Sequence, residues 1–348
     1  MVPLSDPAIP VLDLRRRWEP RERELADALE RVVRSGRLLL GPETDAFEAE
    51  FADFCGRRHA VAVASGTEAL RLSLVALDVG PGDEVIVPAL TAVPTAAAVC
   101  AAGAVPVPVD VDRETAGIDP AAVAVALTDR TRAVIPVHLY GRPQSLPDVD
   151  VPVLEDAAQA HGALDPAASS RAAAYSFYPT KNLGGLGDGG AVVTDDPQLA
   201  ERVRTLRAHA LRGEYEHTEI AGNSRLSEFE AAVLRIGLRE LADGNARRTM
   251  IAMRYRAAAP ALRWQKPHER HVYHLCVARV PDRDAFRSRM PFETAVHYPR
   301  ALTQQPAYER FRRAACPEAE AWASECVSLP CFPEMTDDEI EAVCRALP

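Results

Sequence analysis

The sequence predicts an α/β fold in which a mostly parallel central sheet is covered by helices and followed by a smaller C-terminal α+β domain. Between about residues 60 and 195, short β-branched apolar runs alternate with helical patterns, as expected for buried parallel strands connected by helices. After Ser227 a long helical stretch replaces this alternation. We therefore expect a large domain over 36–240 and a small domain over 241–348, with the N-terminal segment 1–35 packing on the small domain.

Local patterns predict the individual elements. A helix is expected over 20–34, and another after the Gly41-Pro42 turn, where Phe47, Phe51 and Phe54 recur at helical spacing. Strands are expected over 59–64, 84–87, 105–109, 133–138, 151–154, 172–177 and 190–194. The C-terminal part is expected to contain a helix over 231–241 that continues towards residue 255, a strand over 272–280 and a helix over 337–347.

Composition and charge exclude several classes of protein. The 348 residues include 40 basic and 50 acidic side chains, a formal net charge of −10, which argues against a nucleic-acid partner. The seven cysteines are odd in number and form no Cys-x-x-Cys pair, so neither a disulfide framework nor a metal site is expected. Residues 1–10 do not resemble a signal peptide, and prolines interrupt the most apolar stretch, 93–109. We expect a cytoplasmic protein without a membrane span.

Lys181 is one of only two lysines in a chain that otherwise uses arginine. A primary amine forms a Schiff base with an aldehyde, whereas a guanidinium stays protonated and cannot. Lys181 follows the predicted strand 172–177 and precedes a glycine-rich segment that ends at Gly190. Chance survival of an isolated lysine is the alternative if this residue is considered alone, so its neighbours decide the interpretation.

Two further segments could bind a charged ligand. Ser65-Gly66-Thr67 joins a predicted strand to a helix, and the start of a helix attracts anions such as phosphate, although a simple helix cap is the alternative. Asp156 follows the buried strand 151–154, where a carboxylate needs a cationic partner unless it caps the next helix. Gly185-x-Gly187-x-x-Gly190 fits the dinucleotide fingerprint, but it precedes a strand, so we reject that interpretation.

Together these features match the requirements of pyridoxal 5′-phosphate. The cofactor has a phosphate for the Ser65–Thr67 turn and the Ser176 hydroxyl, a ring nitrogen for Asp156 and an aldehyde for Lys181, which lies 25 residues after Asp156. We therefore expect this cofactor, with pyridoxamine 5′-phosphate as its form during turnover.

The chain resembles the DegT/DnrJ/EryC1/StrS family of fold-type-I aminotransferases, which make amino sugars and aminocyclitols. The segments that carry the resemblance are 65–70, 81–88, 136–141, 155–162, 176–184, 187–190, 223–226 and 297–299. They occur in family order from about residue 40 to the C-terminus. The resemblance implies the pyridoxal-phosphate-dependent transferase fold of type I and a homodimer with shared active sites.

The resemblance also implies roles for residues around the cofactor. Lys181 would hold the cofactor and then move a proton between it and the substrate carbon. Asp156 would pair with the ring nitrogen, and Gln159 would lie beside the ring hydroxyl. Gly66, Thr67 and Ser176 would hold the phosphate.

The remaining implied roles concern the substrate and the partner subunit. Asn223 would reach the phosphate of the neighbouring subunit, with Arg225 beside it. His297 and Tyr298 resemble the segment that lines the substrate pocket, although ordinary packing at a strand end is the alternative. Tyr178 and His161 lie near the cofactor by sequence without an assigned role.

Ala92 departs from the family pattern. Relatives commonly place an aromatic residue there, which stacks on the cofactor. In this chain that ring is missing or supplied from elsewhere, and His161 is one candidate. The details of the pocket therefore transfer less safely from relatives than the chemistry of Lys181.

The expected activity is transfer of an amino group from glutamate or glutamine to a nucleotide-linked keto-deoxysugar, with a dTDP-3-keto-6-deoxyhexose favoured, in amino-sugar and antibiotic biosynthesis. Alternatives are a 4-keto sugar or a keto-cyclitol as acceptor. Dehydratases of this fold carry histidine in place of the lysine, so Lys181 argues against dehydration. A regulatory protein without catalysis is a further alternative, against which the intact Lys181, Asp156 and Ser176 argue.

Overall fold

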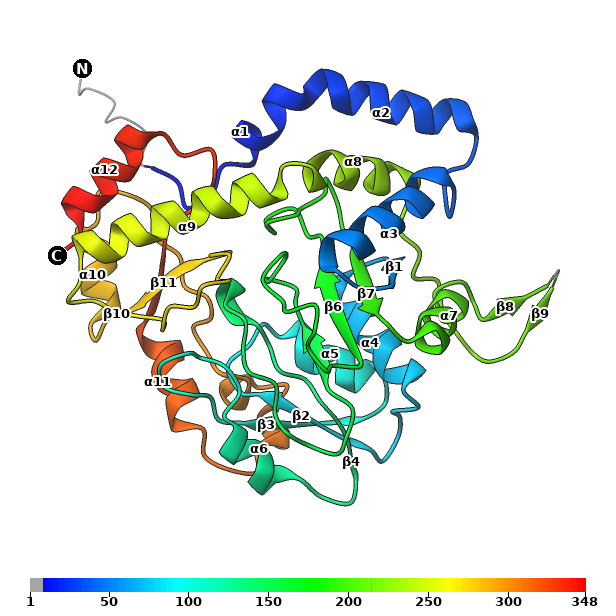
Figure 1. Cartoon of the computed structure of the whole chain (residues 1–348). Helices are drawn as coiled ribbons and strands as arrows, with labels where there is room; N and C mark the ends of the chain where they lie inside the picture. The colour runs from blue at the N-terminus through cyan, green and yellow to red at the C-terminus, as the bar shows by residue number, and fades with distance from the viewer. Residues whose placement is uncertain (1–8, 214) are drawn as a thin grey trace.

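The computed structural model describes residues 9–213 and 215–348, and its centre is a mixed sheet (Figure 1). The strands are β1 (His59–Val63), β2 (Glu84–Pro88), β3 (Val105–Val109), β4 (Thr131–Val134), β5 (Leu154–Asp156), β6 (Ala172–Ser176) and β7 (Gly190–Thr194). Parallel bridges from Val134 to Val153 and from Val137 to Asp156 join the β3-β2-β4 part to the β5-β6-β7-β1 part. β7 runs antiparallel to β1 and β6, and the other pairs are parallel.

Two of the expected strands are displaced along the chain. β4 ends at Val134 instead of residue 138, because Pro136 has no N–H group with which to continue the ladder. β5 was expected over 151–154 but runs from Leu154 to Asp156. The shift matters for the site, because it makes Asp156 the last residue of a buried strand.

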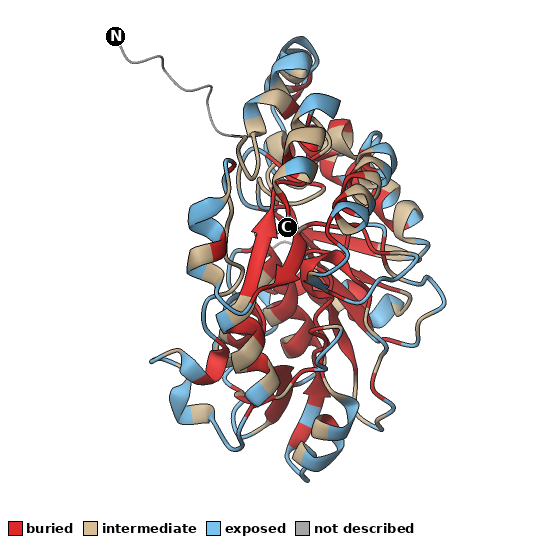
Figure 2. Ribbon diagram, turned by 90° about the vertical axis from the view of Figure 1, so that its left-hand side faces the viewer, coloured by how far each residue is buried: buried red, intermediate tan, exposed pale blue. Residues whose placement is uncertain are grey.

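Helices cover both faces of the sheet. They are α3 (Pro42–Cys55), α4 (Gly66–Ala76), α5 (Pro94–Ala101), α6 (Pro120–Ala126), α7 (Pro197–Leu206) and α8 (Glu228–Leu238). α4, α5 and α7 share one apolar core that includes Ala174, whereas α3 and α8 share another that includes Tyr175. Because successive strand residues point to opposite faces, β6 is buried on both sides. Figure 2 shows buried central strands beneath helices whose outer faces are exposed.

The C-terminal part forms a second, smaller sheet with its own core. α9 (Leu241–Ala258) leads into the antiparallel strands β10 (Arg263–Trp264), β11 (Cys276–Arg279) and β12 (Cys326–Leu329). α10 (Arg283–Arg289), α11 (Pro317–Glu325) and α12 (Asp337–Ala346) surround them. β11 is shorter than the strand expected over 272–280, so residues 272–275 and 280 lie outside it. Short elements complete the chain: η1 (Glu19–Arg21), η2 (Leu139–Gly141), β8 (Leu211–Arg212), β9 (Glu216–His217), η3 (Leu302–Gln304) and η4 (Glu309–Phe311).

The N-terminal segment contacts both parts of the protein. In α1 (Leu14–Trp18), Arg16 donates two hydrogen bonds of 2.8 Å to Glu339 of α12. α2 (Glu22–Ser35) instead packs on α8 (Figure 1). Segment 1–35 was expected to pack on the small domain; α1 contacts α12 of the C-terminal part and α2 contacts α8, and residues 1–8 lie outside the described residues. The proposed division near residue 240 coincides with the junction of α8 and α9.

No helix within residues 9–213 and 215–348 is both long and apolar enough to cross a membrane. The same residues contain no group of three or more His, Cys, Asp or Glu side chains placed to hold a metal ion.

Glu228 fixes the start of α3 from a distant part of the chain. Its carboxylate accepts hydrogen bonds of 2.9 Å from the backbone N–H groups of Gly41, Glu43 and Thr44, and another from the Thr44 hydroxyl. Burial alone would raise the pKa of Glu228, but these hydrogen bonds outweigh it and the pKa is lowered. A buried carboxylate that caps a helix therefore ties α8 to α3.

We expect Glu228→Ala to reduce the free energy of unfolding by about 2–3 kcal/mol, because three backbone N–H groups at the start of α3 lose their acceptor. Since the pKa of Glu228 is lowered in the folded protein, its contribution is present above the ordinary carboxyl pKa and is lost as the pH falls through the folded value. Chemical denaturation at several pH values measures both effects. The exposed Glu219→Ala is the control, and equal stability of the two variants would contradict this role for Glu228.

Candidate active site

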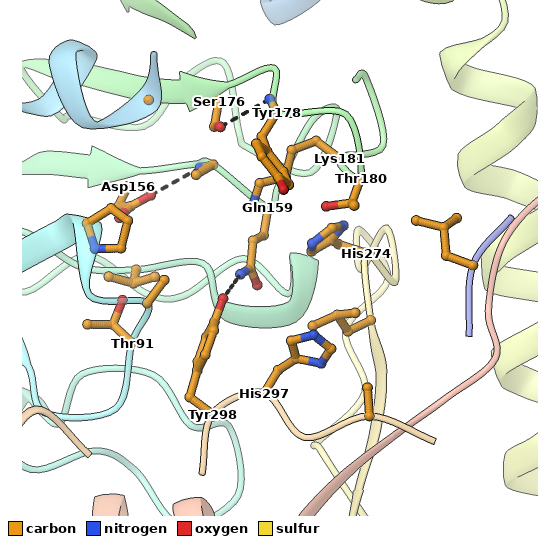
Figure 3. A pocket seen from close by; sticks show the side chains of 18 of the residues that line it. Thr91, Asp156, Gln159, Ser176, Tyr178, Thr180, Lys181, His274, His297 and Tyr298 are labelled. Carbon is orange, nitrogen blue, oxygen red and sulfur yellow. Dashed lines mark hydrogen bonds between the residues drawn. The ribbon is translucent and has the colours of Figure 1, made fainter. Parts of the chain in front are cut away.

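A cavity of about 620 Å³ opens where the carboxyl ends of β5 and β6 meet the C-terminal part of the chain (Figure 3). This edge is where open α/β sheets bind ligands. Its lining includes the sequence-predicted residues Gly66, Thr67, Asp156, Gln159, Ser176, Tyr178, Lys181, His297 and Tyr298. The structure thus brings together most of the residues that the sequence singled out.

One end of the cavity is built for an anion. The Ser65 side chain caps α4 by accepting a hydrogen bond of 3.2 Å from Glu68 N, which leaves the first N–H groups of the helix directed at the cavity. A Cβ atom on Gly66 would lie 2.6 Å from Ser176 Cβ. Glycine is therefore required at residue 66 for the Ser176 hydroxyl to lie beside the start of α4. A helix terminus and a hydroxyl are suitable ligands for a phosphate.

Asp156 is a buried carboxylate without a cationic hydrogen-bond partner among the described residues. Its two oxygens accept hydrogen bonds from Thr95 Oγ1 at 2.8 Å and Ala158 N at 3.1 Å. Burial raises the pKa of Asp156, and the hydrogen bonds from Thr95 and Ala158 oppose that shift only in part. A ring N–H⁺ in the cavity would supply the positive charge that this carboxylate lacks.

Lys181 lies in a loop whose backbone is held from several sides. Lys181 N donates to Tyr178 O at 2.8 Å, and the buried Arg17 donates to Lys181 O at 3.0 Å and Pro179 O at 3.1 Å. Burial lowers the pKa of Lys181 to about 8, and the negative charge of Asp156 opposes this shift. A far larger fraction of the amine is therefore neutral and nucleophilic near neutral pH than in an ordinary lysine.

Gln159 links the two halves of the cavity. Its Oε1 accepts a hydrogen bond of 2.6 Å from Tyr140 N, and its Nε2 donates to Tyr298 Oη at 3.0 Å (Figure 3). Burial raises the pKa of Tyr298 to about 12, although the hydrogen bond to Gln159 lowers it. Tyr298 is therefore a neutral phenol at physiological pH, and Gln159 positions it beside the cavity.

Other predicted residues differ in how closely they approach the cavity. Tyr178 lines it with about half of its surface exposed. His297 also lines it, with Nδ1 2.9 Å from Ser328 Oγ. Ala92 lies on the wall as well, so this position contributes no ring. The aromatic side chains that line the cavity are those of Tyr178, His274, His297 and Tyr298.

Three predicted residues do not line this cavity. His161 is fully buried between Tyr175 and Phe177, with ring centroids 5.3 and 5.9 Å away. Its enclosed position on the α3 side of β6 does not support the idea that it replaces the missing stacking aromatic. Asn223 and Arg225 lie at the protein surface, where Arg225 Nε donates to Asn223 Oδ1 at 2.8 Å.

Sequence reasoning missed Thr95 and His274. Thr95 is completely buried at the start of α5 and donates a hydrogen bond to Asp156. The sequence feature that could have identified it is a hydroxyl residue inside an otherwise apolar helix. His274 lines the cavity just before β11. The sequence feature that could have identified it is a histidine within the apolar run 272–280.

These residues fit pyridoxal 5′-phosphate on structural grounds. The cavity combines an anion-binding helix start, a buried carboxylate that lacks a cation and a desolvated primary amine. Replacing Gly66 by any larger residue would fill the space beside Ser176. Each feature corresponds to one functional group of the cofactor.

Comparisons with known proteins agree with this arrangement. A family model described as the DegT/DnrJ/EryC1/StrS aminotransferase family matches residues 20–348. The dTDP-3-amino-3,4,6-trideoxy-alpha-D-glucose transaminase of Streptomyces venezuelae is 45% identical over 350 residues, which cover 94% of this chain and 92% of that protein.

Solved structures show the same fold. The crystal structure of S. venezuelae DesV in complex with a ketimine intermediate matches with a TM-score of 0.93 and 43% identity, covering 98% of each chain. NtdA from Bacillus subtilis with bound cofactor PMP matches with a TM-score of 0.91 and 27% identity, covering 99% of this chain and 86% of NtdA. The fold, the family and the aminotransferase activity expected from the sequence are thereby confirmed. This chain belongs to the DegT/DnrJ/EryC1/StrS aminotransferase family.

Proposed function

We propose that this aminotransferase uses pyridoxal 5′-phosphate to move an amino group from glutamate or glutamine to a nucleotide-linked keto-deoxysugar, with a dTDP-3-keto-6-deoxyhexose as the favoured acceptor. The observation that carries the proposal is the placement of the Lys181 amine and the Asp156 carboxylate in one cavity with an anion-binding helix start. The similarity to a transaminase of a dTDP-linked sugar supports the choice of acceptor.

When bound, the cofactor supplies an aldehyde that captures amines and a ring that accepts electrons from the substrate carbon. Lys181 would hold the cofactor through its amine, and the same amine would carry the proton to and from the substrate carbon. Asp156 would supply the negative charge that favours a protonated ring nitrogen. Thr95 and the N–H group of Ala158 hold the Asp156 carboxylate in one orientation for this task.

The remaining residues of the proposed site bind and orient. Gly66, Thr67 and Ser176 would hold the phosphate, and Gln159 would lie on the side of the ring hydroxyl. Tyr298 and His297 contact the substrate at the opposite wall of the cavity, and Tyr178 borders its opening. These assignments are proposals supported by the lining of the cavity.

We also propose a homodimer in which Asn223 reaches the phosphate in the partner's site, with Arg225 beside it. Both residues lie at the surface and do not line the cavity of their own chain, which is compatible with such a role. A cytoplasmic location remains a prediction.

Substitution of Lys181 tests the activity. We expect Lys181→Ala and Lys181→Arg each to lower amine transfer from glutamate to a dTDP-3-keto-6-deoxyhexose by about 10²–10⁴-fold or more, because neither retains a nucleophilic amine. The measurement combines single-turnover kinetics with borohydride reduction and mass spectrometry, which locates the bound cofactor on Lys181.

Lys266→Ala is the matched control, since Lys266 is the other lysine of the chain and is exposed beside Glu114. Its transfer rate should equal that of the wild type. Unchanged transfer by Lys181→Ala would refute the proposal. Wild-type protein that reacts with a keto-cyclitol and with no nucleotide keto-sugar would refute the acceptor assignment alone.

The pH dependence of cofactor attachment tests the lowered pKa of Lys181. Only the neutral amine attacks an aldehyde, and the neutral form predominates above the pKa. We therefore expect the rate of covalent attachment to cofactor-free protein to rise with pH through a midpoint of about 8. Asp156→Asn should shift the midpoint lower, because it removes a charge that favours the protonated amine. Stopped-flow absorbance measures the rate, and a midpoint at the ordinary lysine value of about 10.4 would contradict a desolvated amine.

Subunit mixing tests the shared site. We expect Lys181→Ala and the double variant Asn223→Ala/Arg225→Ala to be impaired alone. After subunit exchange they should regain about a quarter of wild-type activity, because half of the dimers are mixed and each mixed dimer has one intact site. If mixing restores no activity while exchange is complete by mass spectrometry, Asn223 and Arg225 do not serve the partner's site.

A further inference from the structure

His274 is a buried histidine on the cavity wall that has no role in the proposed function. It lies between the Lys181 loop and His297 (Figure 3). Among the described residues, His274 and His297 are the two histidines that line the cavity. Only 8% of the His274 surface is exposed, so the ring cannot turn freely towards solvent.

A chain of amide side chains fixes the tautomer of His274. Asn245 Nδ2 donates to the backbone oxygen of His161 at 2.8 Å, which orients the Asn245 amide, since a carbonyl oxygen can only accept. Asn182 Nδ2 then donates to Asn245 Oδ1 at 2.8 Å and to Val272 O at 3.0 Å.

This arrangement leaves Asn182 Oδ1 as the atom that faces His274 Nδ1, at 3.1 Å. An amide oxygen has no proton to donate, so the proton in this hydrogen bond belongs to His274 Nδ1. Burial, with the nearby positive charge of Lys181 as a further cause, lowers the pKa of His274 well below its ordinary value. The ring is therefore neutral, and Nε2 carries a lone pair.

Among the residues that the structure describes, none donates a hydrogen bond to His274 Nε2, and the ring borders the cavity. His161 provides a contrast, because both of its ring nitrogens are enclosed in the core and it does not line the cavity. His274 thus presents a hydrogen-bond acceptor of fixed orientation to whatever fills the cavity beside Lys181.

The backbone holds His274 equally firmly. Val272 N donates to Gly141 O at 3.0 Å, and Leu275 N donates to Tyr140 O at 3.2 Å. Tyr140, Gly141 and Tyr273 all have positive φ angles, of 65°, 95° and 42°. For the two tyrosines this is a strained conformation of the kind that accumulates at binding sites. A Cβ atom on Gly141 would lie 2.9 Å from His274 N, so the close approach requires glycine.

We propose that His274 Nε2 accepts a hydrogen bond from a hydroxyl group of the keto-sugar, on a carbon next to the carbonyl carbon. The inference rests on the proposed function. The sugar approaches Lys181 through its carbonyl carbon, so the neighbouring hydroxyls are the donors that come nearest to His274. The phosphates and carbonyl of the sugar only accept hydrogen bonds, and the only donor that glutamate brings is its ammonium group, whose nitrogen is the reacting atom. His274 therefore determines specificity for the acceptor and not for the amino donor.

The test is a double-mutant cycle in which one change removes the acceptor atom of His274 and the other removes a hydroxyl donor from the sugar. The substrates are a dTDP-3-keto-6-deoxyhexose and its analogues without the hydroxyl at C4 or at C2. We expect His274→Phe to lower kcat/KM for the parent sugar by about 10–100-fold, as for the loss of one buried hydrogen bond. For one of the two deoxy analogues, the same substitution should change kcat/KM by less than about 3-fold, because the hydrogen bond is already absent.

Two further variants separate recognition from structure. His274→Gln keeps an acceptor near the position of Nε2 and should recover most of the loss. His268→Phe is the matched control, because it makes the same substitution at an exposed histidine in the same segment and should leave all sugars unaffected. Calorimetric titration with the amino-sugar product should rank the binding affinities of wild type, His274→Gln and His274→Phe in the same order as their kcat/KM values.

The reaction with glutamate distinguishes this inference from the proposed function. The donor half-reaction of His274→Phe should proceed at the wild-type rate. If His274→Phe lowers kcat/KM equally for the parent sugar and both deoxy analogues, or lowers the rate with glutamate as much as with the sugar, the role of His274 is overturned. If His274→Phe does not fold, comparison of the three sugars with wild-type protein and His274→Gln still decides, and equal kcat/KM for all three sugars refutes the inference. Failure of the wild-type protein to react with glutamate would refute the proposed function instead.

Discussion

The site depends on two opposite charges that are held in a desolvated cavity and are only partly compensated by each other. Burial lowers the pKa of Lys181 to about 8 and raises that of Asp156, and each group opposes the shift of the other. Isolated buried charges are costly, so the surrounding structure must keep both groups in place. Thr95 and Ala158 N hold the carboxylate, and Arg17 holds the loop of the lysine.

The cavity shape depends on close backbone contacts as much as on charged groups. Gly66 allows Ser176 to approach the start of α4, and Gly141 allows the segment of His274 to approach the turn that carries Tyr140. Gln159 connects that turn to Tyr298. Together these contacts join the carboxyl edge of the main sheet to the C-terminal part of the chain. The side of the cavity that carries Asp156 and Lys181 is therefore held in a fixed position relative to the side that carries His274 and Tyr298.

The sequence predicted those parts of the fold and site that depend on local patterns. The alternation of apolar runs and helical patterns predicted the layered sheet, and Lys181, Asp156 and the Ser65–Thr67 turn could be recognised because each follows a predicted strand. Features that depend on distant contacts could not be predicted in this way. Arg17, Thr95 and the Asn245–Asn182–His274 chain acquire their roles through partners 61 or more residues away along the sequence. For the same reason the sequence could not show that His161 lies behind the wall or that α2 packs on α8.

The protonation state of the cofactor ring is the most direct test of whether Asp156 serves as the counter-ion of the ring nitrogen. Protein reconstituted with cofactor labelled with ¹⁵N at the ring nitrogen can be examined by NMR spectroscopy near neutral pH. We expect the chemical shift of a protonated ring nitrogen in the wild type, and loss of that proton in Asp156→Asn, because the buried carboxylate would be the counter-ion that stabilises it. A deprotonated ring nitrogen in the wild type, or an unchanged protonated one in Asp156→Asn, would contradict the role assigned to Asp156.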